Sequence, residues 1–217
     1  MTLGLLPTAW TASHTGRAMP APAATSDEDL MLTYVAGDAA AFDALYARHR
    51  GGVYRYLLRQ CRQGGIADEL FQDVWTNLIR ARASYAPTAK FTTWLYRLAH
   101  NRLIDHYRAS GHLKLVSADD EANEDAVAAL PGASGEEPQA RAENRELGER
   151  LRAAVAALPP AQREAFLLQQ EGGLSLAEIA ELTGTGAETV KSRLRYAVAK
   201  LRENLIDLND EQREGLA

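Results

Sequence analysis

Apolar residues recur at helical spacing in two blocks of the chain, and a stretch without that period separates them. Between residues 27 and 110, and again between 140 and 208, apolar side chains repeat every three or four positions. That interval places them on one face of a helix, whereas the apolar–polar alternation typical of a strand is not sustained anywhere in the sequence. The pattern predicts an all-α chain with two helical domains.

The first block is predicted to contain several helices and one loop. Apolar positions lie on either side of Gly51 and Gly52, and a further helix over 68–81 turns its apolar side chains inward. The outer face of that helix carries polar side chains, namely Asp68, Gln72, Asp73, Thr76 and Asn77. Because Pro87 cannot continue a helix, we expect a loop over 84–90, followed by another helix from Thr92 to about Arg108.

Residues 175–202 have the pattern of two capped helices joined by a glycine turn. Ser175 and Glu178 have the spacing of a capping box, in which a hydroxyl and a carboxylate bind the free amides of a helix start. Thr185 and Glu188 repeat this spacing, and glycines at 184 and 186 lie at the junction. Upstream, the prolines at 159 and 160 are expected to start another helix.

The last of these helices is predicted to bury one stripe and to expose another. The buried stripe consists of Val190, Leu194, Ala197 and Leu201. The opposite side carries Thr189, Ser192, Arg195 and Tyr196, with Lys191 and Arg193 on its flanks. A helix-turn-helix with a basic, hydrogen-bonding outer face is typical of major-groove DNA binding. From this stretch alone, the alternative is an ordinary helical hairpin with a solvated charged face.

Charge is distributed unevenly along the chain. The 217 residues carry a net charge of -5, and 46% hydrophobic with 24% charged residues is typical of a soluble globular protein. Residues 41–110 hold eleven basic and five acidic side chains, whereas 118–149 hold two basic and ten acidic ones. We therefore expect residues 111–139, which lack an apolar period, to form a flexible acidic linker.

Tails are expected at both ends of the chain, over 1–26 and 209–217. The first is rich in Ala, Thr and Pro, and is expected to be disordered or to be an upstream start-codon artefact, with Met19 or Met31 as the true start. Its apolar run at 3–6 is too short for a signal peptide or a membrane span. No stable membrane association is therefore expected.

One face of the helix expected over 92–108 combines positive charge with an amide. Arg97, Asn101 and Arg108 share this face; arginine pairs with phosphate, and asparagine can hydrogen-bond a base edge. Tyr85 and Phe91 precede it, and aromatic rings beside basic residues suit unstacked single-stranded bases. The alternative interpretation is a solvated helix face beside aromatic residues of the core.

The sequence has no arrangement typical of catalysis or of cofactor binding. A single cysteine, Cys61, excludes an internal disulfide and a cysteine zinc cluster, and it fits a reducing cytoplasm. His100 and His106 lie six positions apart, too far round a helix to share a metal. The glycine pairs at 64–65 and 172–173 are expected at helix ends rather than in a phosphate-binding loop. We expect no enzymatic activity and no metal or cofactor.

Four pieces of the sequence, in their order and spacing, resemble the extracytoplasmic-function group of bacterial RNA polymerase sigma factors. They are AFDALYARHRGGVYRYLLR, DELFQDVWTNLIRA, FTTWLYRLAHNRLIDHYR and LPPAQREAFLLQQEGGLSLAEIAELTGTGAETVKSRLRYAVAKLREN. The likeness covers residues 27–208. It implies a region 2 bundle at 27–110 and a region 4 helix-turn-helix domain at 140–208. The first tail and the rather long acidic linker depart from the family pattern.

The resemblance implies a role for each exposed surface. The helix over 68–81 is similar to the clamp-binding helix, which implies docking on the polymerase β′ coiled coil by Asp68, Glu69, Gln72, Asp73 and Asn77. The loop and helix after it are similar to the region that melts the minus-ten element and captures a flipped base, which implies contacts from Tyr85, Lys90, Phe91, Trp94, Arg97, Asn101 and Arg108. The last helix is similar to the reader of the minus-thirty-five element, which implies contacts from Thr189, Lys191, Ser192, Arg193, Arg195 and Tyr196. The acidic linker is similar to the segment threaded through the RNA path.

The implied function is that of a cytoplasmic sigma factor. Such a protein binds core RNA polymerase through the β′ and β subunits and directs promoter recognition, DNA melting and transcription initiation at a specialised, stress-responsive regulon. Members of the group are often held inactive by an anti-sigma factor. Two alternatives remain: a dimeric helix-turn-helix regulator, which would need a ligand pocket or a dimer face in the first block, and an enzyme with an incidental helix-turn-helix.

Overall fold

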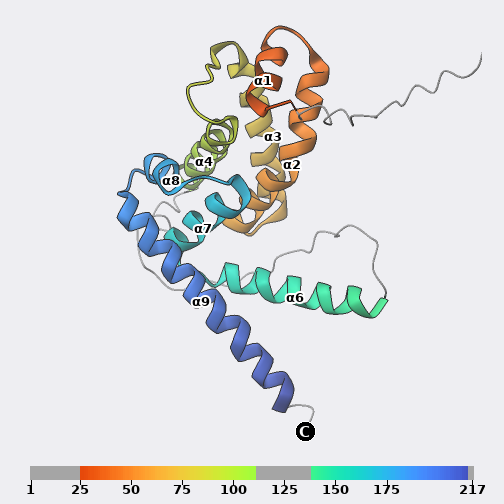
Figure 1. The fold of residues 1–217 in the computed structure, drawn as a ribbon, viewed down its shortest axis with the longest axis vertical. Helices are drawn as coiled ribbons and strands as arrows, with labels where there is room; N and C mark the ends of the chain where they lie inside the picture. The colour runs from red at the N-terminus through yellow and green to blue at the C-terminus, as the bar shows by residue number, and fades with distance from the viewer. Residues whose placement is uncertain (1–24, 111–137, 215–217) are drawn as a thin grey trace, which may run out of the picture.

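The computed structural model describes residues 25–110 and 138–214, and all regular secondary structure in these ranges is helical (Figure 1). The N-terminal block contains α1 (Asp27–Val35), α2 (Ala39–Cys61), α3 (Gly64–Ala81), a short 3₁₀ turn (Arg82–Ser84) and α4 (Phe91–Ala109). The C-terminal block contains α6 (Pro138–Ala156), α7 (Pro160–Gly172), α8 (Leu176–Thr183) and α9 (Ala187–Glu214). The predicted all-α fold is confirmed for this part of the chain. The first tail up to residue 24 and most of the predicted linker, 111–137, lie outside the described residues.

The apolar stripes of α1 to α4 meet in one bundle. Met31 of α1, Tyr56 of α2, Leu78 of α3 and Leu95 of α4 are completely buried, and Trp75 is 5% exposed. Burial of one such side chain stabilises the fold by about 1.5–3 kcal/mol. The inward stripes read from the sequence therefore hold the bundle together and leave the polar faces of α3 and α4 outside.

The glycine pair at 64–65 is the main departure from the predicted helix boundaries. α2 runs without interruption through Gly51 and Gly52 to Cys61, and it is capped by Arg62, whose φ of 58° is left-handed. Glycine usually occupies such a position because a side chain there is strained. Because Arg62 makes this turn itself, Gly64 and Gly65 begin α3 rather than end a helix, and α3 starts before the predicted residue 68.

The first half of the predicted helix-turn-helix is confirmed. α7 starts at Pro160 and ends at Gly172, and it is capped by Gly173, whose φ of 63° is left-handed. Ser175 Oγ accepts a hydrogen bond from the Glu178 amide (3.3 Å), and a Glu178 carboxylate oxygen accepts one from the Ser175 amide (2.8 Å). This is the predicted capping box, and Gly184 then closes α8 with a φ of 64°.

The second predicted capping box does not form. α9 begins at Ala187, and the Thr185 hydroxyl turns back to lie 3.0 Å from Thr183 Oγ1. The Glu188 carboxylate instead lies 3.6 Å from Lys191 Nζ. The predicted inner stripe of α9 is buried, at Val190, Leu194, Ala197 and Leu201. The helix continues to residue 214, into the segment that was expected as a tail.

The capping box at Ser175 makes the stability of the fold depend on pH in the acid range. The pKa of the Glu178 carboxylate is lowered from 4.5 to about 2, chiefly by the hydrogen bond from the Ser175 hydroxyl. Hydrogen bonds from Thr93 and from the Ser175 amide and the charge of Lys90 act in the same direction, whereas partial burial opposes the change. The resulting stabilisation is present above pH 4.5 and is lost as the pH falls towards 2. We expect Glu178→Gln to be less stable than the wild type at pH 6, with the difference in unfolding free energy narrowing between pH 4.5 and 2. Urea denaturation at each pH measures the two unfolding free energies. A difference between them that does not change with pH would contradict the lowered pKa of Glu178.

The C-terminal block packs against the bundle. α7 lies across α2 and contacts α4, and α8 contacts α4, whereas much of α6 and α9 projects away from the bundle (Figure 1). None of the helices in the described ranges is long and apolar enough to cross a membrane. The two blocks form one body through α7 and α8, while the outer face of α9 stays accessible.

Candidate nucleic-acid interface

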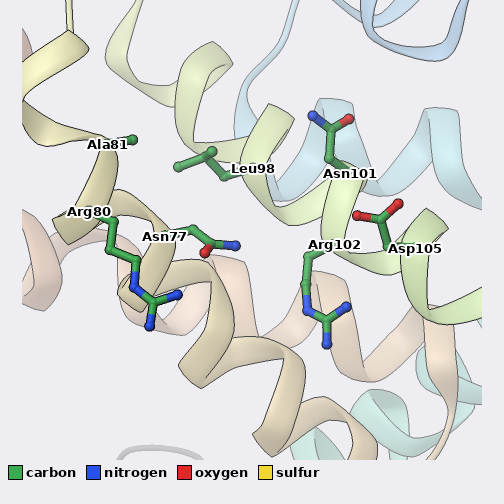
Figure 2. A pocket seen from close by; sticks show the side chains of 7 residues that line it. All are labelled: Asn77, Arg80, Ala81, Leu98, Asn101, Arg102 and Asp105. Carbon is green, nitrogen blue, oxygen red and sulfur yellow. The ribbon is translucent and has the colours of Figure 1, made fainter.

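A groove of about 450 Å³ lies between the C-terminal half of α3 and the middle of α4. It is lined by Asn77, Arg80, Ala81, Leu98, Asn101, Arg102 and Asp105. Figure 2 shows Asn77 extending from α3 towards α4, while Asn101 and Asp105 lie next to each other on α4. The groove brings together one residue predicted for polymerase binding, Asn77, and one predicted for single-stranded DNA, Asn101.

The chemistry of this groove suits a nucleotide. Each asparagine amide offers both donors and acceptors, so Asn77 and Asn101 can bind the polar edge of a base. The guanidinium groups of Arg80 and Arg102 are placed for phosphate oxygens. Leu98 supplies the apolar surface on which a base plane can rest. A small apolar metabolite would offer no polar contact to the two amides or to Arg80.

The Arg102 side chain links the groove to the outer face of α3. Its Nε donates a hydrogen bond to Asp73 Oδ2 at 2.6 Å, and the two side chains are 28% and 40% exposed. Asp73 and Asn77, both predicted to dock on polymerase, therefore face α4. The other three predicted residues, Asp68, Glu69 and Gln72, are exposed to solvent. The predicted polymerase-binding set thus divides between two surfaces.

The two aromatic residues predicted to stack on bases are core residues in this structure. Tyr85 is 8% exposed and Phe91 is fully buried. Both rings pack on Trp94, with centroids 5.0 and 6.0 Å from it, and the Phe91 amide donates a hydrogen bond to Glu28 Oε1. Trp94, in contrast, is only half-buried. The sequence alone does not separate a core ring from a stacking surface, because burial depends on the elements that pack against the ring.

The predicted cations of the minus-ten site all have carboxylate partners. Arg97 Nη2 lies 2.6 Å from Glu181 Oε1, and Lys90 Nζ lies 3.9 Å from Glu178 Oε2. Both glutamates belong to α8, in the C-terminal block. Arg108 pairs within α4, 3.6 Å from an Asp105 oxygen. Arg97 and Asn101, predicted to share one face, therefore separate: the first points to α8 and the second lines the groove.

Most of the predicted outer face of α9 is exposed, and Ser192 is the exception. Tyr196 is 55% exposed, Thr189 and Lys191 are also exposed, and Ser192 and Arg193 are half-buried. The Arg195 guanidinium lies 4.9 Å from the centre of the Tyr196 ring and donates a 3.2 Å hydrogen bond to its hydroxyl. This contact pre-orders the arginine on the open face. A major groove about 12 Å wide accommodates such a helix.

Sequence reasoning missed several cations at these surfaces. Arg80 follows Asn77 by three positions, so helical spacing alone places both on one face. Arg102 follows Asn101 directly and reaches the groove because α3 packs beside it. On α9, Arg202 joins Lys191 and Arg195 along a second groove of about 460 Å³. In the described residues no three His, Cys, Asp or Glu side chains are grouped as metal ligands.

Comparisons with known proteins agree with this architecture. The sigma-70 region 2 model matches residues 45–112, and the sigma-70 region 4 model matches residues 148–201. The RNA polymerase sigma factor CarQ of Myxococcus xanthus is 31% identical over 172 residues, which cover 79% of this chain and 93% of CarQ. The ECF RNA polymerase sigma factor SigK of Mycolicibacterium vanbaalenii is 30% identical over 192 residues, covering 88% of this chain and 95% of SigK.

A solved structure shares the fold. The sigma factor RpoE from Bartonella quintana, in complex with the anti-sigma factor NepR, superposes with a TM-score of 0.58 at 22% identity. The match covers 76% of this chain and 96% of that one. At this identity the likeness concerns the arrangement of helices.

Proposed function

Because the chain belongs to the extracytoplasmic-function group of sigma-70 factors, which direct promoter-specific transcription, we propose that its two domains divide the promoter between them. The N-terminal bundle docks on core RNA polymerase through the exposed side of α3, and it binds and melts the minus-ten element. The C-terminal helix-turn-helix reads the minus-thirty-five element with α9. The relatives are sigma factors rather than enzymes, and the phosphodiester chemistry belongs to the polymerase.

The observation that carries the minus-ten assignment is the groove between α3 and α4. Its two amides, two guanidinium groups and apolar floor match the parts of one unstacked nucleotide. Flipping a base out of duplex DNA costs a few kcal/mol, which such contacts can offset. We assign Asn101 and Asn77 to the base edge and Arg80 and Arg102 to the flanking phosphates.

The proposed partners follow from the family. Core polymerase contributes its β′ and β subunits, and promoter DNA is the second partner. The neighbour RpoE was solved with the anti-sigma factor NepR, and we extend regulation by a partner of that kind to this chain. The site of action is the cytoplasm, where the core polymerase is found.

Reconstitution tests this function. Purified protein is mixed with core polymerase from the same bacterium, and complex formation is followed by size-exclusion chromatography, with transcription from fragmented genomic DNA as the second readout. We expect a stable complex and a few discrete start sites that are absent with core polymerase alone. A dimer that binds duplex DNA and ignores polymerase would support the helix-turn-helix regulator instead.

The recognition helix gives a more specific prediction. Arg195 lies in the middle of the exposed face, so it is placed to contact a base edge. Half-buried Arg193 lies on the flank of that face, where it would contact the phosphate backbone of the DNA. A bidentate base contact contributes about 1–3 kcal/mol of discrimination, and a phosphate contact adds affinity without sequence information. We expect Arg195→Ala to relax preference at one or two minus-thirty-five positions.

Arg193→Ala is the matched comparison. It is expected to weaken use of all promoters evenly and to reduce the slope of log affinity against log salt by about one. Promoter libraries transcribed with each variant at two salt concentrations separate the two effects. Uniform loss of activity in Arg195→Ala, with base preferences unchanged, would contradict the proposed placement of α9 in the DNA major groove.

A further inference from the structure

The groove between α3 and α4 contains a carboxylate that the contacts assigned above do not use. Asp105 follows Asn101 by one turn of α4, and Figure 2 shows its carboxylate beside the Asn101 amide. It is the acidic residue among those that line the groove. DNA carries a negative charge on each phosphate, and a carboxylate repels it. Asp105 therefore favours binding only where the ligand brings a hydrogen-bond donor to it.

The Asp105 carboxylate is only weakly neutralised within the protein. One of its oxygens lies 3.6 Å from Arg108 Nη1, and the two side chains are 60% and 64% exposed. Exposed pairs of this kind contribute little. Asp73, at the edge of the groove, differs because its carboxylate accepts a 2.6 Å hydrogen bond from Arg102 Nε. The oxygens of Asp105 are thus accessible to a ligand, whereas Asp73 is held by Arg102.

Leu98, Asn101 and Asp105 follow one another along one face of α4. Residues three and four positions apart are neighbours on the surface of a helix, with their Cβ atoms about 5–6 Å apart. In this order the three side chains present an apolar surface, an amide and a carboxylate to the groove. A single base can therefore rest on Leu98 while the polar atoms of its edge meet Asn101 and Asp105.

The carboxylate adds a preference that the amide does not have. An ionised carboxylate only accepts hydrogen bonds, whereas an amide both donates and accepts them. Adenine, cytosine and guanine each carry an exocyclic amino group, which donates. Thymine has no amino group, and its N3–H lies between two carbonyl oxygens that a carboxylate repels. Asp105 therefore has the chemistry to separate the three amino-bearing bases from thymine.

We propose that Asp105 is a specificity-determining residue of the minus-ten site, where it selects an unstacked base with an amino group and rejects thymine. The proposal rests on the assignment of the groove to the minus-ten element. The amino group of the base donates to Asp105, and Asn101 binds the neighbouring polar atom of the same edge. The charge of Asp105 weakens the binding of every strand, and only an amino-bearing base compensates for this loss.

The test first finds the promoter position that the groove reads. Transcription of a randomised promoter library by the holoenzyme is compared between the wild-type protein and Asn101→Ala, and the minus-ten position whose preference is lost is the position in question. If no minus-ten position changes, the assignment of the groove to this element fails, and the inference fails with it.

Promoter templates with a pre-melted bubble are then made with each of the four bases at that position. We expect the wild-type holoenzyme to bind the thymine template about tenfold more weakly than the cytosine template. Two modified bases separate the amino group from the methyl group of thymine. Deoxyuridine lacks both groups and is expected to bind as weakly as thymine, whereas 5-methylcytosine has both and is expected to bind like cytosine. Deoxyuridine that binds as tightly as cytosine would overturn the proposal.

Asp105→Asn is the deciding variant, because it keeps the shape of the side chain and adds a donor for thymine O4. We expect it to raise affinity for the thymine template about tenfold, to near that for cytosine. Asp43→Asn removes the same charge from an exposed site on α2 and is expected to leave the preference unchanged. Arg108→Gln removes the ion-pair partner of Asp105 and is expected to keep the rejection of thymine, even where overall affinity falls.

Two results would overturn the role of Asp105 while leaving the proposed function intact. One is equal affinity of the wild-type holoenzyme for all four bases at a position that Asn101→Ala affects. The other is a change in affinity in Asp105→Asn that is the same for all four bases, which is the behaviour of a solvated carboxylate without a contact to the base.

Discussion

Replacing Asp68 and Glu69 together with arginine is expected to weaken assembly with core polymerase about thirtyfold or more. Both carboxylates are exposed on the outer face of α3, and loss of one partner from a docked charge pair costs about 2–5 kcal/mol, where 1.4 kcal/mol is tenfold. Titration of labelled core polymerase with each variant measures the dissociation constant. Circular dichroism should be unchanged, because neither side chain is buried.

Asp43→Arg is the matched control for this substitution. Asp43 is exposed on α2, and its substitution likewise replaces an acidic side chain by a basic one. Asp73 is a poorer probe of this interface, because its carboxylate binds Arg102 at 2.6 Å and its loss also disturbs the nucleotide groove. Core affinity that stays the same in the Asp68 and Glu69 double variant, or falls equally in Asp43→Arg, would remove this face of α3 from the interface.

Asn101→Ala is expected to slow open-complex formation on duplex promoters by about tenfold to a hundredfold. The lost base contact is worth about 1–3 kcal/mol, and it is needed while the base is being unstacked. A template with a pre-melted bubble should restore much of the rate, because the cost of unstacking has been removed. Permanganate footprinting over time follows the opening.

Three further variants help to define the groove. Asn77→Ala is expected to behave like Asn101→Ala, because both amides line the groove, whereas Thr76→Ala, on the exposed side of α3, is expected to have no effect. Tyr85→Ala is expected to destabilise the bundle by about 3–5 kcal/mol, as large-to-small core substitutions do. Equal loss on duplex and bubble templates in Asn101→Ala would exclude a role in melting.

The helices and their inner stripes were predictable because each depends on local spacing. Val190, Leu194, Ala197 and Leu201 are buried as their period requires, and Ser175 caps α8 as its distance from Glu178 indicates. The predicted helix boundary was wrong where a single backbone conformation determines it. Arg62 takes a left-handed turn that glycine usually provides, so the neighbouring glycines begin α3 instead.

Contacts between helices distant in sequence could not be read from local patterns. Arg97 and Asn101 share a face by spacing, yet α8 binds the first and α3 borders the second. The burial of Tyr85 and Phe91 likewise depends on α1 and Trp94, which pack on them in three dimensions. The hydrogen bonds of Glu171 with Arg55 and Arg59 join residues more than a hundred positions apart. Charge counts along the sequence contain no information about such pairing.

Transcription of a randomised promoter library by the reconstituted holoenzyme tests most directly whether this one chain reads two promoter elements. Start sites and the sequences upstream of them are mapped with the wild-type protein, Asn101→Ala and Arg195→Ala. We predict enrichment of two separate motifs near minus ten and minus thirty-five, with Asn101→Ala weakening the first and Arg195→Ala relaxing the second. Enrichment of a single motif, or of none above core polymerase alone, would contradict the account.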